Sequence, residues 1–388
     1  MKILILGWDG YIGYPLTQHL LGRGHEIFGI DNFSRRHRVE EAGSNSLTPI
    51  ADGDIRKYKI GIGDLSRRSY TTLGRCSPTY IRSILSDFKP DAIVHLAEQP
   101  SAAWSMKDPF HAGTTQYENV IGTLHLLWAM KEECPEAHLI KLGTMGEYGT
   151  PACDIPEGEI PYSCLHKGKF AISCPMSGLL FPRTPGSFYH LSKVHDTYNI
   201  EFACRNWGLR STDIMQGVVF GLNETNDESL LTRFDYDEFF GTAINRFCIQ
   251  AIIEHPLTVY GKGNQQRGFL PLKDSIQCLT LAIDNPPEHG EYRTFNQFEN
   301  IYSINKLANM VAHSATELNL DPSISHIKPN PRLENEDHYY NPTCQKLFNL
   351  GYQPTTDIQG EITKLIKTIL PYKDRVIKEV IMPKVNWR

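Results

Sequence analysis

Tyr189 and Lys193 are four residues apart, a spacing that brings two side chains to one face of a helix. A nearby ammonium group favours the phenolate, so Lys193 is expected to lower the pKa of the Tyr189 phenol from its usual value of about 10. Such a phenolate is a general base for a sugar hydroxyl, and a threonine hydroxyl could hold the same oxygen in place. This spacing often occurs by chance, so it becomes informative only beside a dinucleotide site.

A glycine pattern at the start of the chain could bind a dinucleotide. Gly7, Gly10 and Gly13 are spaced as Gly-x-x-Gly-x-x-Gly between a predicted strand at 2–6 and a predicted helix at 12–21. Glycines at these positions permit a tight turn and let a pyrophosphate approach the backbone at the positive end of the helix. The residues that this motif assigns to the cofactor are Gly7, Gly10, Tyr11, Ile12 and Gly13.

The acidic residue after the second predicted strand favours NAD as the cofactor. Asp31 should accept hydrogen bonds from the adenosine ribose, and its charge would repel the 2′-phosphate of NADP. Arg35 and Arg36 could serve NADP, but a solvated loop or contact with the NAD phosphates is the favoured interpretation. Asp64 could touch adenine or be a plain turn residue. Further predicted cofactor contacts are Asn32, Leu65, Leu96, Asn119 and Gln216.

Alternating strands and helices must position these groups. Short apolar runs predict strands at 2–6, 26–30, 92–96, 139–142 and 212–220. Helices are predicted at 12–21, 117–131 and 187–206. This alternation is typical of an α/β fold with a Rossmann-type, doubly wound parallel sheet. The last helix carries Tyr189 and Lys193, and Gly208 ends it.

Two domains are expected. Residues 1–222 are predicted to form mainly the NAD-binding domain. Within it, 151–185 is rich in Pro, Gly and Cys and has no sustained period, so we expect an inserted loop or small hairpin over the site. Beyond it the alternation weakens, so 223–388 is predicted to be mainly a smaller substrate-binding domain interleaved with the first.

The composition excludes several function classes. The chain has 388 residues, 40% hydrophobic and 21% charged, with a net charge of -5, which is ordinary for a globular enzyme and offers no basic surface for nucleic acid or anionic lipid. No apolar run is long enough to span a membrane, and no histidine or cysteine cluster has zinc spacing. Nine scattered cysteines without a Cys-x-x-Cys favour reduced thiols and a cytoplasmic location.

The glycine motif, a threonine after the fourth strand and Tyr-x-x-x-Lys together resemble the extended short-chain dehydrogenase/reductase superfamily, whose members mostly act on nucleotide sugars. Longer stretches resemble one of its branches, the UDP-sulfoquinovose synthase family, nearly end to end and most weakly at 151–185. The stretches that carry this resemblance lie at 95–99, 119–123, 141–149, 187–196, 256–263 and 330–332.

The resemblance implies synthesis of UDP-6-sulfoquinovose from UDP-glucose and sulfite, a reaction of sulfolipid biosynthesis, with NAD recycled internally. Tyr189 would take the proton of the C4 hydroxyl, Lys193 would hold the phenolate and bind the nicotinamide ribose, and Thr144 would orient the C4 oxygen. The 4-ketone acidifies the C5 proton, whose loss expels the C6 hydroxyl, and sulfite then adds to the 5,6-ene. A homodimer is expected by analogy.

The resemblance leaves the base at C5 and the acid at C6 open. Ordinary 4,6-dehydratases carry an Asp-Glu pair directly after the threonine, where this chain has Met145 and Gly146. Glu147 is one candidate, with a buried ion pair as the alternative interpretation. His190 is the other, with a plain helix-surface position as its alternative.

For the substrate, Arg267 and Arg332 suit the UDP diphosphate, and Gln99 and Gln265 could hydrogen-bond sugar or uracil. The chain departs from the family at Pro100, where an arginine is usual, and in a longer gap between Thr144 and Tyr189. These departures leave room for a sulfite-donating protein or a different C6 partner. The alternatives are therefore a related UDP-sugar 5,6-dehydratase or 4-epimerase, or a non-catalytic NAD-binding protein.

Overall fold

The computed structural model describes residues 1–53, 55–56, 77–160, 165–166, 169–170, 179–385 and 387. Its centre is a parallel sheet, six-stranded within the described residues, in the order β13-β9-β4-β3-β1-β2. The strands are β1 (Lys2–Leu6), β2 (Glu26–Ile30), β3 (Ala92–His95), β4 (His138–Thr144), β9 (Arg210–Gln216) and β13 (Tyr292–Gln297). The chain leaves β1 for β2 on one side and for β3 on the other, which confirms the predicted doubly wound sheet and places a switch point at β1.

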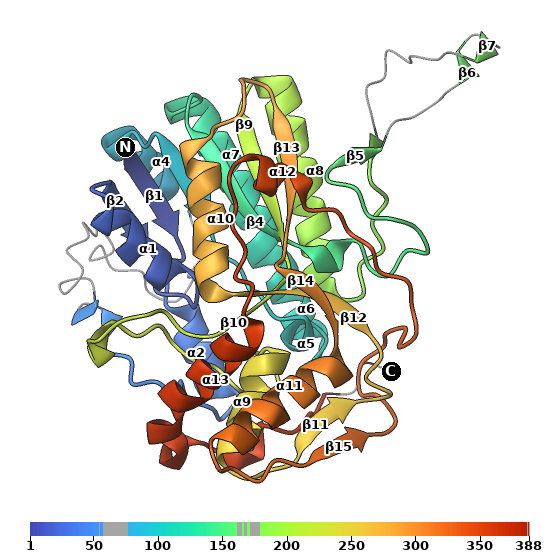
Figure 1. Cartoon of the computed structure of the whole chain (residues 1–388). Helices are drawn as coiled ribbons and strands as arrows, with labels where there is room; N and C mark the ends of the chain where they lie inside the picture. Colours follow the sequence, from blue (N-terminus) through green and yellow to red (C-terminus); the bar gives the residue numbers. More distant parts are fainter. Residues whose placement is uncertain are drawn as a thin grey trace.

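Helices cover both faces of this sheet (Figure 1). The helices are α1 (Gly13–Gly22), α4 (Pro78–Phe88), α7 (Gly122–Glu133), α8 (Phe188–Trp207) and α10 (Leu272–Asp284). Side chains of β1 alternate between the faces: Ile3 and Ile5 share an apolar core with α1 and α10, whereas Leu4 and Leu6 share one with α4, α7 and α8. Burial on both faces explains why β1, β2 and β3 are mainly apolar runs.

The second half of the chain builds a further core below the sheet in the view of Figure 1. Its elements are β10 (Val218–Phe220), α9 (Ala243–Ile252), β11 (Leu257–Tyr260), β12 (Gln266–Pro271), β14 (Asn300–Ser303), α11 (Ile304–Glu317), β15 (Ile324–Ile327) and α13 (Ile358–Ile369). Helix α12 (Gln345–Asn349) lies apart from this core, beside β13 (Figure 1). Strands β10, β12 and β14 form one small sheet, and β11 pairs with β15. The division at residue 222 stays a prediction. Helix α10 and strand β13 follow this residue in the sequence, yet they join the first core and the central sheet.

Two predicted elements differ from the structure. The strand predicted at 212–220 is divided at Gly217 into β9 and β10, which belong to different sheets. A Cβ at Gly217 would lie 2.7 Å from the Gly268 carbonyl oxygen, so this crossing admits only glycine. The helix predicted at 117–131 begins with a π-helical turn, η1 (Tyr117–Ile121), before α7. The local pattern of apolar residues predicts neither of these two interruptions.

Short elements complete the region between β2 and α8. They are α2 (Ser34–Glu41), α5 (Ala102–Ser105), α6 (Pro109–Gln116) and the 3₁₀ turn η2 (Met145–Glu147). In the inserted segment the described residues form two antiparallel pairs, β5 (Glu159–Ile160) with β8 (Leu179–Leu180) and β6 (Leu165–His166) with β7 (Lys169–Phe170). A hairpin was one of the two forms expected for this insertion.

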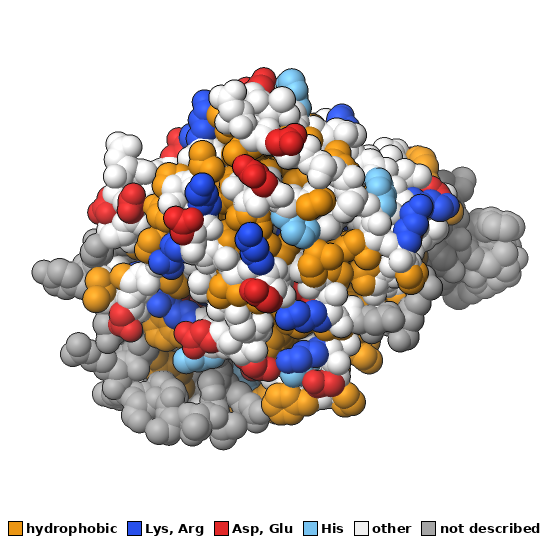
Figure 2. Space-filling model, turned by 90° about the horizontal axis from the view of Figure 1, so that it is seen from below, with side chains coloured by type: hydrophobic (Ala, Val, Ile, Leu, Met, Phe, Trp, Pro, Cys, Tyr) orange, Lys and Arg blue, Asp and Glu red, His pale blue; other side chains and the backbone are white. Residues whose placement is uncertain are grey.

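The surface view agrees with the composition. Figure 2 shows basic and acidic side chains interspersed over the lower face of the molecule. Among the described residues, no helix combines the length and apolar character needed to cross a membrane. The six cysteines that the structure describes are free thiols, five of them buried.

Candidate active site

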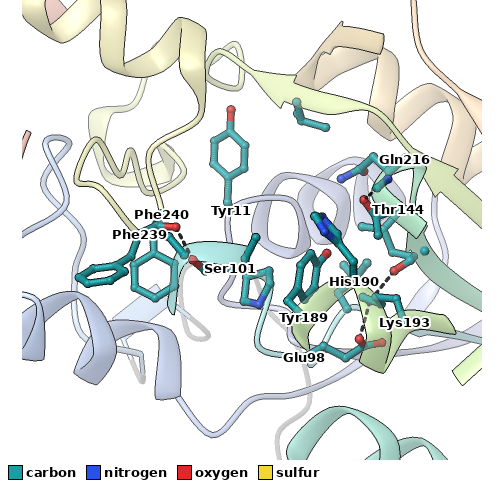
Figure 3. Close-up of a pocket in the computed structure, with 18 of the residues that line it drawn as sticks. Tyr11, Glu98, Ser101, Thr144, Tyr189, His190, Lys193, Gln216, Phe239 and Phe240 are labelled. Atoms are coloured by element: carbon teal, nitrogen blue, oxygen red, sulfur yellow. Dashed lines mark hydrogen bonds and ion pairs between the residues drawn. The ribbon is translucent and has the colours of Figure 1, made fainter. Parts of the chain in front are cut away.

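A cavity of about 1320 Å³ opens at the carboxyl ends of the parallel strands and extends to the second core. Four residues that end parallel strands line it: Leu6 of β1, His95 of β3, Thr144 of β4 and Gln216 of β9. Figure 3 shows Thr144, Tyr189, His190 and Lys193 grouped on one side, with Phe239 and Phe240 farther along. In open α/β sheets, ligands bind at this edge, beside the switch point.

The glycine motif forms a cradle of backbone at one end of the cavity. Gly7 has φ +86°, and a Cβ there would lie 2.8 Å from the carbonyl carbon of Leu96. A Cβ at Gly13 would lie 2.1 Å from the Gly7 carbonyl oxygen, so the first turn of α1 packs directly on the loop. Gly10, Tyr11 and Ile12 line the same wall. Bare backbone at a helix N-terminus fits the pyrophosphate of a dinucleotide.

Asp31 directly follows β2, and its carboxylate is turned back to the glycine loop. It accepts hydrogen bonds from the backbone N–H of Asp9 at 2.9 Å and of Phe33 at 2.7 Å. Burial, together with the charge of Asp9, raises the pKa of Asp31 to about 6. Asn32, Leu96 and Gln216 also line the cavity, as expected. The predicted contacts Asp64 and Leu65 lie outside the described residues.

The two arginines after Asp31 have different positions. Arg35 lines the cavity, donates to Asp235 at 2.9 Å and stacks on Phe240 at 3.9 Å from the ring centroid. Arg36 is not among the described residues of the cavity wall, because its guanidinium forms a bidentate pair with Asp9, at 2.7 and 2.9 Å. Its assignment to the cofactor stays a prediction, because the buried Asp9 inside the glycine motif engages its guanidinium here.

The side chains of Gln99 and Asn119 bind to the segment that follows β3. Neither residue is among those described residues that line the cavity. Both are fully buried. Asn119 accepts from the Gln99 backbone N–H at 2.8 Å and donates to Ser192 Oγ at 2.9 Å, while Gln99 donates to Thr115 Oγ1 at 2.9 Å. The prediction of Gln99 as a substrate contact and of Asn119 as a cofactor contact is corrected accordingly, because both amides are used by the protein itself.

Thr144, Tyr189 and Lys193 meet at the wall of the cavity. Thr144 stands where β4 ends and accepts from the Gly146 backbone N–H at 3.1 Å. Ser187 caps α8 by accepting from the His190 backbone N–H, which begins the helix two residues before Tyr189. The predicted helical spacing thus holds, and the three side chains converge from β4 and α8.

Lys193 is engaged by a carboxylate that the sequence did not single out. Its Nζ lies 2.5 Å from Glu98 and donates to the Leu142 carbonyl oxygen at 2.6 Å. Burial, and next the charge of Glu98, raise the pKa of Tyr189, although a hydrogen bond from Thr144 acts in the opposite direction. The prediction of a lowered Tyr189 pKa is wrong for this arrangement. Glu98 follows β3 at the ligand-binding edge, a position that could have marked it.

His190 and Met145 also line the cavity. The imidazole Nδ1 lies 3.1 Å from Ser187 Oγ. Burial lowers the pKa of His190 to about 3, and the charges of Arg267 and Arg332 act in the same direction, so the ring is neutral near pH 7. Met145 is nearly buried, and its thioether shapes the wall without a proton to transfer.

Glu147 points away from the cavity. It is fully buried and contacts Arg183 at 2.5 Å, Thr197 at 3.2 Å and Lys141 at 3.6 Å. It is not among the described residues of the cavity wall. The assignment of Glu147 to catalysis is corrected: the alternative interpretation, a buried carboxylate paired with an arginine, describes its position.

The second core supplies the far wall of the cavity with Gln265, Arg267 and Arg332. Arg267 pairs with Glu334 at 2.9 Å, and Gln265 donates to the Tyr260 carbonyl oxygen at 3.1 Å. Sequence reasoning missed the buried Arg246, which lines this wall. An arginine inside the otherwise mainly apolar helix α9 was the available signal.

Comparison with known proteins identifies the lineage of the chain. A sequence model of the NAD dependent epimerase/dehydratase family matches residues 3–296. The chain belongs to this family. As an epimerase/dehydratase it is NAD-dependent, and the glycine cradle with Asp31 fits that cofactor. It is 45% identical to a UDP-sulfoquinovose synthase of Sulfolobus acidocaldarius, over 100% of this chain and 98% of the relative. It is 43% identical to the chloroplastic UDP-sulfoquinovose synthase of Spinacia oleracea, over 100% of this chain and 79% of the relative.

Solved structures share the fold of this epimerase/dehydratase. A UDP-glucose 4-epimerase of Thermotoga maritima with UDP-glucose superposes with a TM-score of 0.65 at 19% identity, covering 95% of this chain and 98% of the other. A UDP-glucuronic acid 4-epimerase of Bacillus cereus, with UDP-glucuronic acid and NAD, gives a TM-score of 0.65 at 19% identity over 97% of this chain and all of the other. At this identity the likeness establishes the fold.

Proposed function

We propose that this protein is a UDP-sulfoquinovose synthase, which converts UDP-glucose and sulfite into UDP-6-sulfoquinovose. The observation that carries the proposal is the convergence of Thr144, Tyr189, Lys193 and His190 on one cavity, in a chain that matches two curated synthases over its whole length. The far wall, with Arg267 and Arg332, supplies two guanidinium groups of the kind that suits a diphosphate.

The first chemical step is oxidation at C4 of the glucose. Tyr189, in its phenolate form, receives the proton of the C4 hydroxyl, and Thr144 hydrogen-bonds the same oxygen and orients it. NAD, which the glycine cradle would hold, would supply the hydride acceptor for this oxidation and the hydride donor for the final reduction. Lys193, held by the Leu142 carbonyl oxygen, keeps its ammonium beside the phenol. The product of this step is a 4-ketone, which acidifies the proton at C5.

The second step is loss of the C5 proton and of the C6 hydroxyl. His190 is the base in this proposal, since it is neutral and lines the cavity close to Tyr189, with ring centroids 5.1 Å apart. Part of its lowered pKa comes from Arg267 and Arg332. A diphosphate bound to these arginines would offset their charges, so substrate binding would raise the basicity of the imidazole.

The third step is addition of sulfite at C6. Pro100 lines the cavity where an arginine is usual in the family, so the anion must be met by other groups. Thr150, directly before the inserted segment, and Thr184, near its end, also line the cavity. Thr184 Oγ1 already donates to the Tyr148 carbonyl oxygen at 2.9 Å, so Thr150 is the hydroxyl donor proposed for an anion delivered as free sulfite or by a sulfite-donating protein.

The alternative of a 4-epimerase or 5,6-dehydratase is not favoured, because the curated relatives that match from end to end are synthases. A non-catalytic role is not favoured either, because Thr144, Tyr189 and Lys193 are all present at the cavity wall.

The test is incubation of the protein, with its NAD, with UDP-glucose in the presence and absence of sulfite, followed by mass spectrometry of the nucleotide sugar. A sulfite-dependent product in which sulfonate replaces a hydroxyl is expected. An unchanged substrate mass under both conditions contradicts the proposal. Deuterium uptake at C5 from heavy water then separates an enzyme that awaits another nucleophile from an inactive one.

We also propose that the protein is a homodimer that pairs through α7 and α8. Trp128 on α7 is 49% exposed, and Tyr198 and Phe202 on α8 are 50% and 48% exposed. Trp207 joins this surface, with ring centroids 4.8 Å from Trp128 and 5.9 Å from Phe202. Contiguous exposed aromatic rings on two adjacent helices are typical of a protein interface, and a second copy offers the same surface.

A further inference from the structure

The contact between Glu98 and Lys193 joins the end of β3 to helix α8, across 95 positions of the chain, counting from 98 to 193. Both side chains are nearly inaccessible to water, with 2% and 5% exposure, and the oxygen and nitrogen atoms are 2.5 Å apart. Both residues nevertheless line the cavity. Figure 3 shows the pair beside Tyr189. A contact this short and this shielded from water keeps most of its electrostatic strength.

We propose that Glu98 is a positioning residue of this site: its carboxylate holds the Lys193 ammonium and offsets its charge, and so controls how strongly that charge acts on the Tyr189 phenol. The inference rests on the proposed role of Tyr189 as the base at C4. It goes further by assigning the partner that sets the strength of that base.

The other charged groups around Tyr189 and Lys193 are already balanced. Lys141 on β4 lies between Asp213 on β9, at 3.4 Å, and Glu147, at 3.6 Å. Glu147 is in turn paired with Arg183. These two cations and two carboxylates form a buried group of zero net charge, so their joint effect on the phenol is small.

Two further titratable groups face the pair. Burial raises the pKa of Asp196, one turn after Lys193 on α8, well above its usual value and so favours the neutral carboxyl. Burial lowers the pKa of His95 on β3 to about 4, so its ring is neutral near pH 7. Since burial favours the neutral form of both groups, the charge at Lys193 is offset mainly by its direct partner, Glu98.

The position of the Lys193 ammonium does not depend on Glu98 alone. Lys193 keeps a second contact, its hydrogen bond to the Leu142 carbonyl oxygen at 2.6 Å. A neutral amide at position 98 would still fill the same space, so the ammonium would stay in place with its charge no longer offset. The phenolate of Tyr189 would then be favoured, and its pKa would fall.

The test measures the ionisation of Tyr189 directly, so it does not depend on turnover. The near-ultraviolet phenolate absorbance of the holoenzyme is followed against pH, and the signal of a matched Tyr189→Phe protein is subtracted. Glu98→Gln is expected to move the midpoint down by about one pH unit or more, because a charge within a few ångströms has effects of this size. The rising limb of the pH–rate profile for 4-ketone formation should move in the same direction.

Two variants isolate the cause. Glu133→Gln removes a carboxylate paired with Arg82 at 2.7 Å, on the far end of α7, and should leave both midpoints unchanged. In a Lys193→Met background the buried Glu98 loses its cation and is expected to take up a proton, so Glu98→Gln should move the midpoint down by less than it does with the lysine present. If Glu98→Gln does not fold, Glu98→Asp draws the carboxylate back from Lys193 and should shift the midpoint down by less.

A folded Glu98 variant whose midpoints stay at the parent values, or move upward, would overturn the proposal. Failure of the proposed function is recognised separately. In that case the nucleotide sugar stays unchanged for every variant, while the phenolate titration still reports whether Glu98 acts on Tyr189.

Discussion

The imidazole of His190 lies directly against the α-carbon of Gly146. A Cβ at position 146 would come within 2.3 Å of Nε2 and 2.5 Å of Cδ2 of this ring. Position 146 is the second place of the Asp-Glu pair in ordinary 4,6-dehydratases. The glycine here has no side chain, and this leaves room for the imidazole of His190 on α8.

This relationship predicts that Gly146→Ala displaces His190. Because a small misplacement of a catalytic group is costly, product formation should fall by about a hundredfold, with UDP-glucose and NAD still bound. Steady-state rates and binding isotherms check this. Gly22→Ala, at a glycine with no atom near the added Cβ, is the control and should change neither. A Gly146→Ala enzyme with the parental rate would show that the position of His190 is immaterial.

Tyr189→Phe should abolish the oxidation at C4. Loss of a positioned acid–base group costs about 10²- to 10⁴-fold in rate. The backbone contact of Tyr189 N–H to Ser105 Oγ, 3.0 Å, does not involve the phenol, so the fold and NAD binding should persist. The rate of deuterium uptake at C5 measures the effect. Tyr198→Phe, on an exposed face of the same helix, should retain full activity.

The affinity for NAD should fall as the pH is lowered through about 6. The pKa of Asp31 is raised to about 6, and its ionised form is the acceptor for the ribose hydroxyls. Above this pH the carboxylate is charged and binding is strongest, whereas below it the dissociation constant should rise about tenfold per pH unit. Titration of the NAD-free protein gives this dependence. Asp31→Asn should remove it, whereas Asp284→Asn, in an exposed pair with Arg23, should leave it in place.

Glu147→Gln should lower stability more than activity. Breaking a buried ion pair leaves Arg183 without its partner and costs about 3–5 kcal/mol of unfolding free energy. Chemical denaturation measures this cost. Glu201→Gln removes an exposed pair with Arg205 and should cost about 0.5 kcal/mol or less. A Glu147→Gln protein of unchanged stability that has lost its turnover would return Glu147 to the list of catalytic residues.

Trp128→Glu should dissociate the proposed homodimer. A buried interfacial tryptophan commonly contributes about 2 kcal/mol or more to association, and a charge in its place opposes pairing. Sedimentation over a range of concentrations should show a monomer for this variant. Phe348→Glu, at an exposed ring on α12, should leave the assembly unchanged. A parent protein that sediments as a monomer would contradict the interface.

The sequence by itself determined those features of the fold and the site that depend on a local pattern of residues. Apolar runs predicted β1, β2 and β3 because these strands are buried on both faces, whereas the polar strand β13 was not predicted. The glycines of the first loop predicted the cradle because only bare backbone fits there. The spacing of Tyr189 and Lys193 placed both on α8 at the cavity, because helical geometry is set over one turn.

Tertiary structure decided which groups those side chains meet. Glu98 reaches Lys193 across 95 positions, and Arg183 withdraws Glu147 from the cavity across 36. Gln99 and Asn119 bind each other instead of a ligand. A sequence shows that a carboxylate or an amide is present, but its role depends on which partner offers the stronger contact once water is excluded. That choice is made only when distant segments pack together.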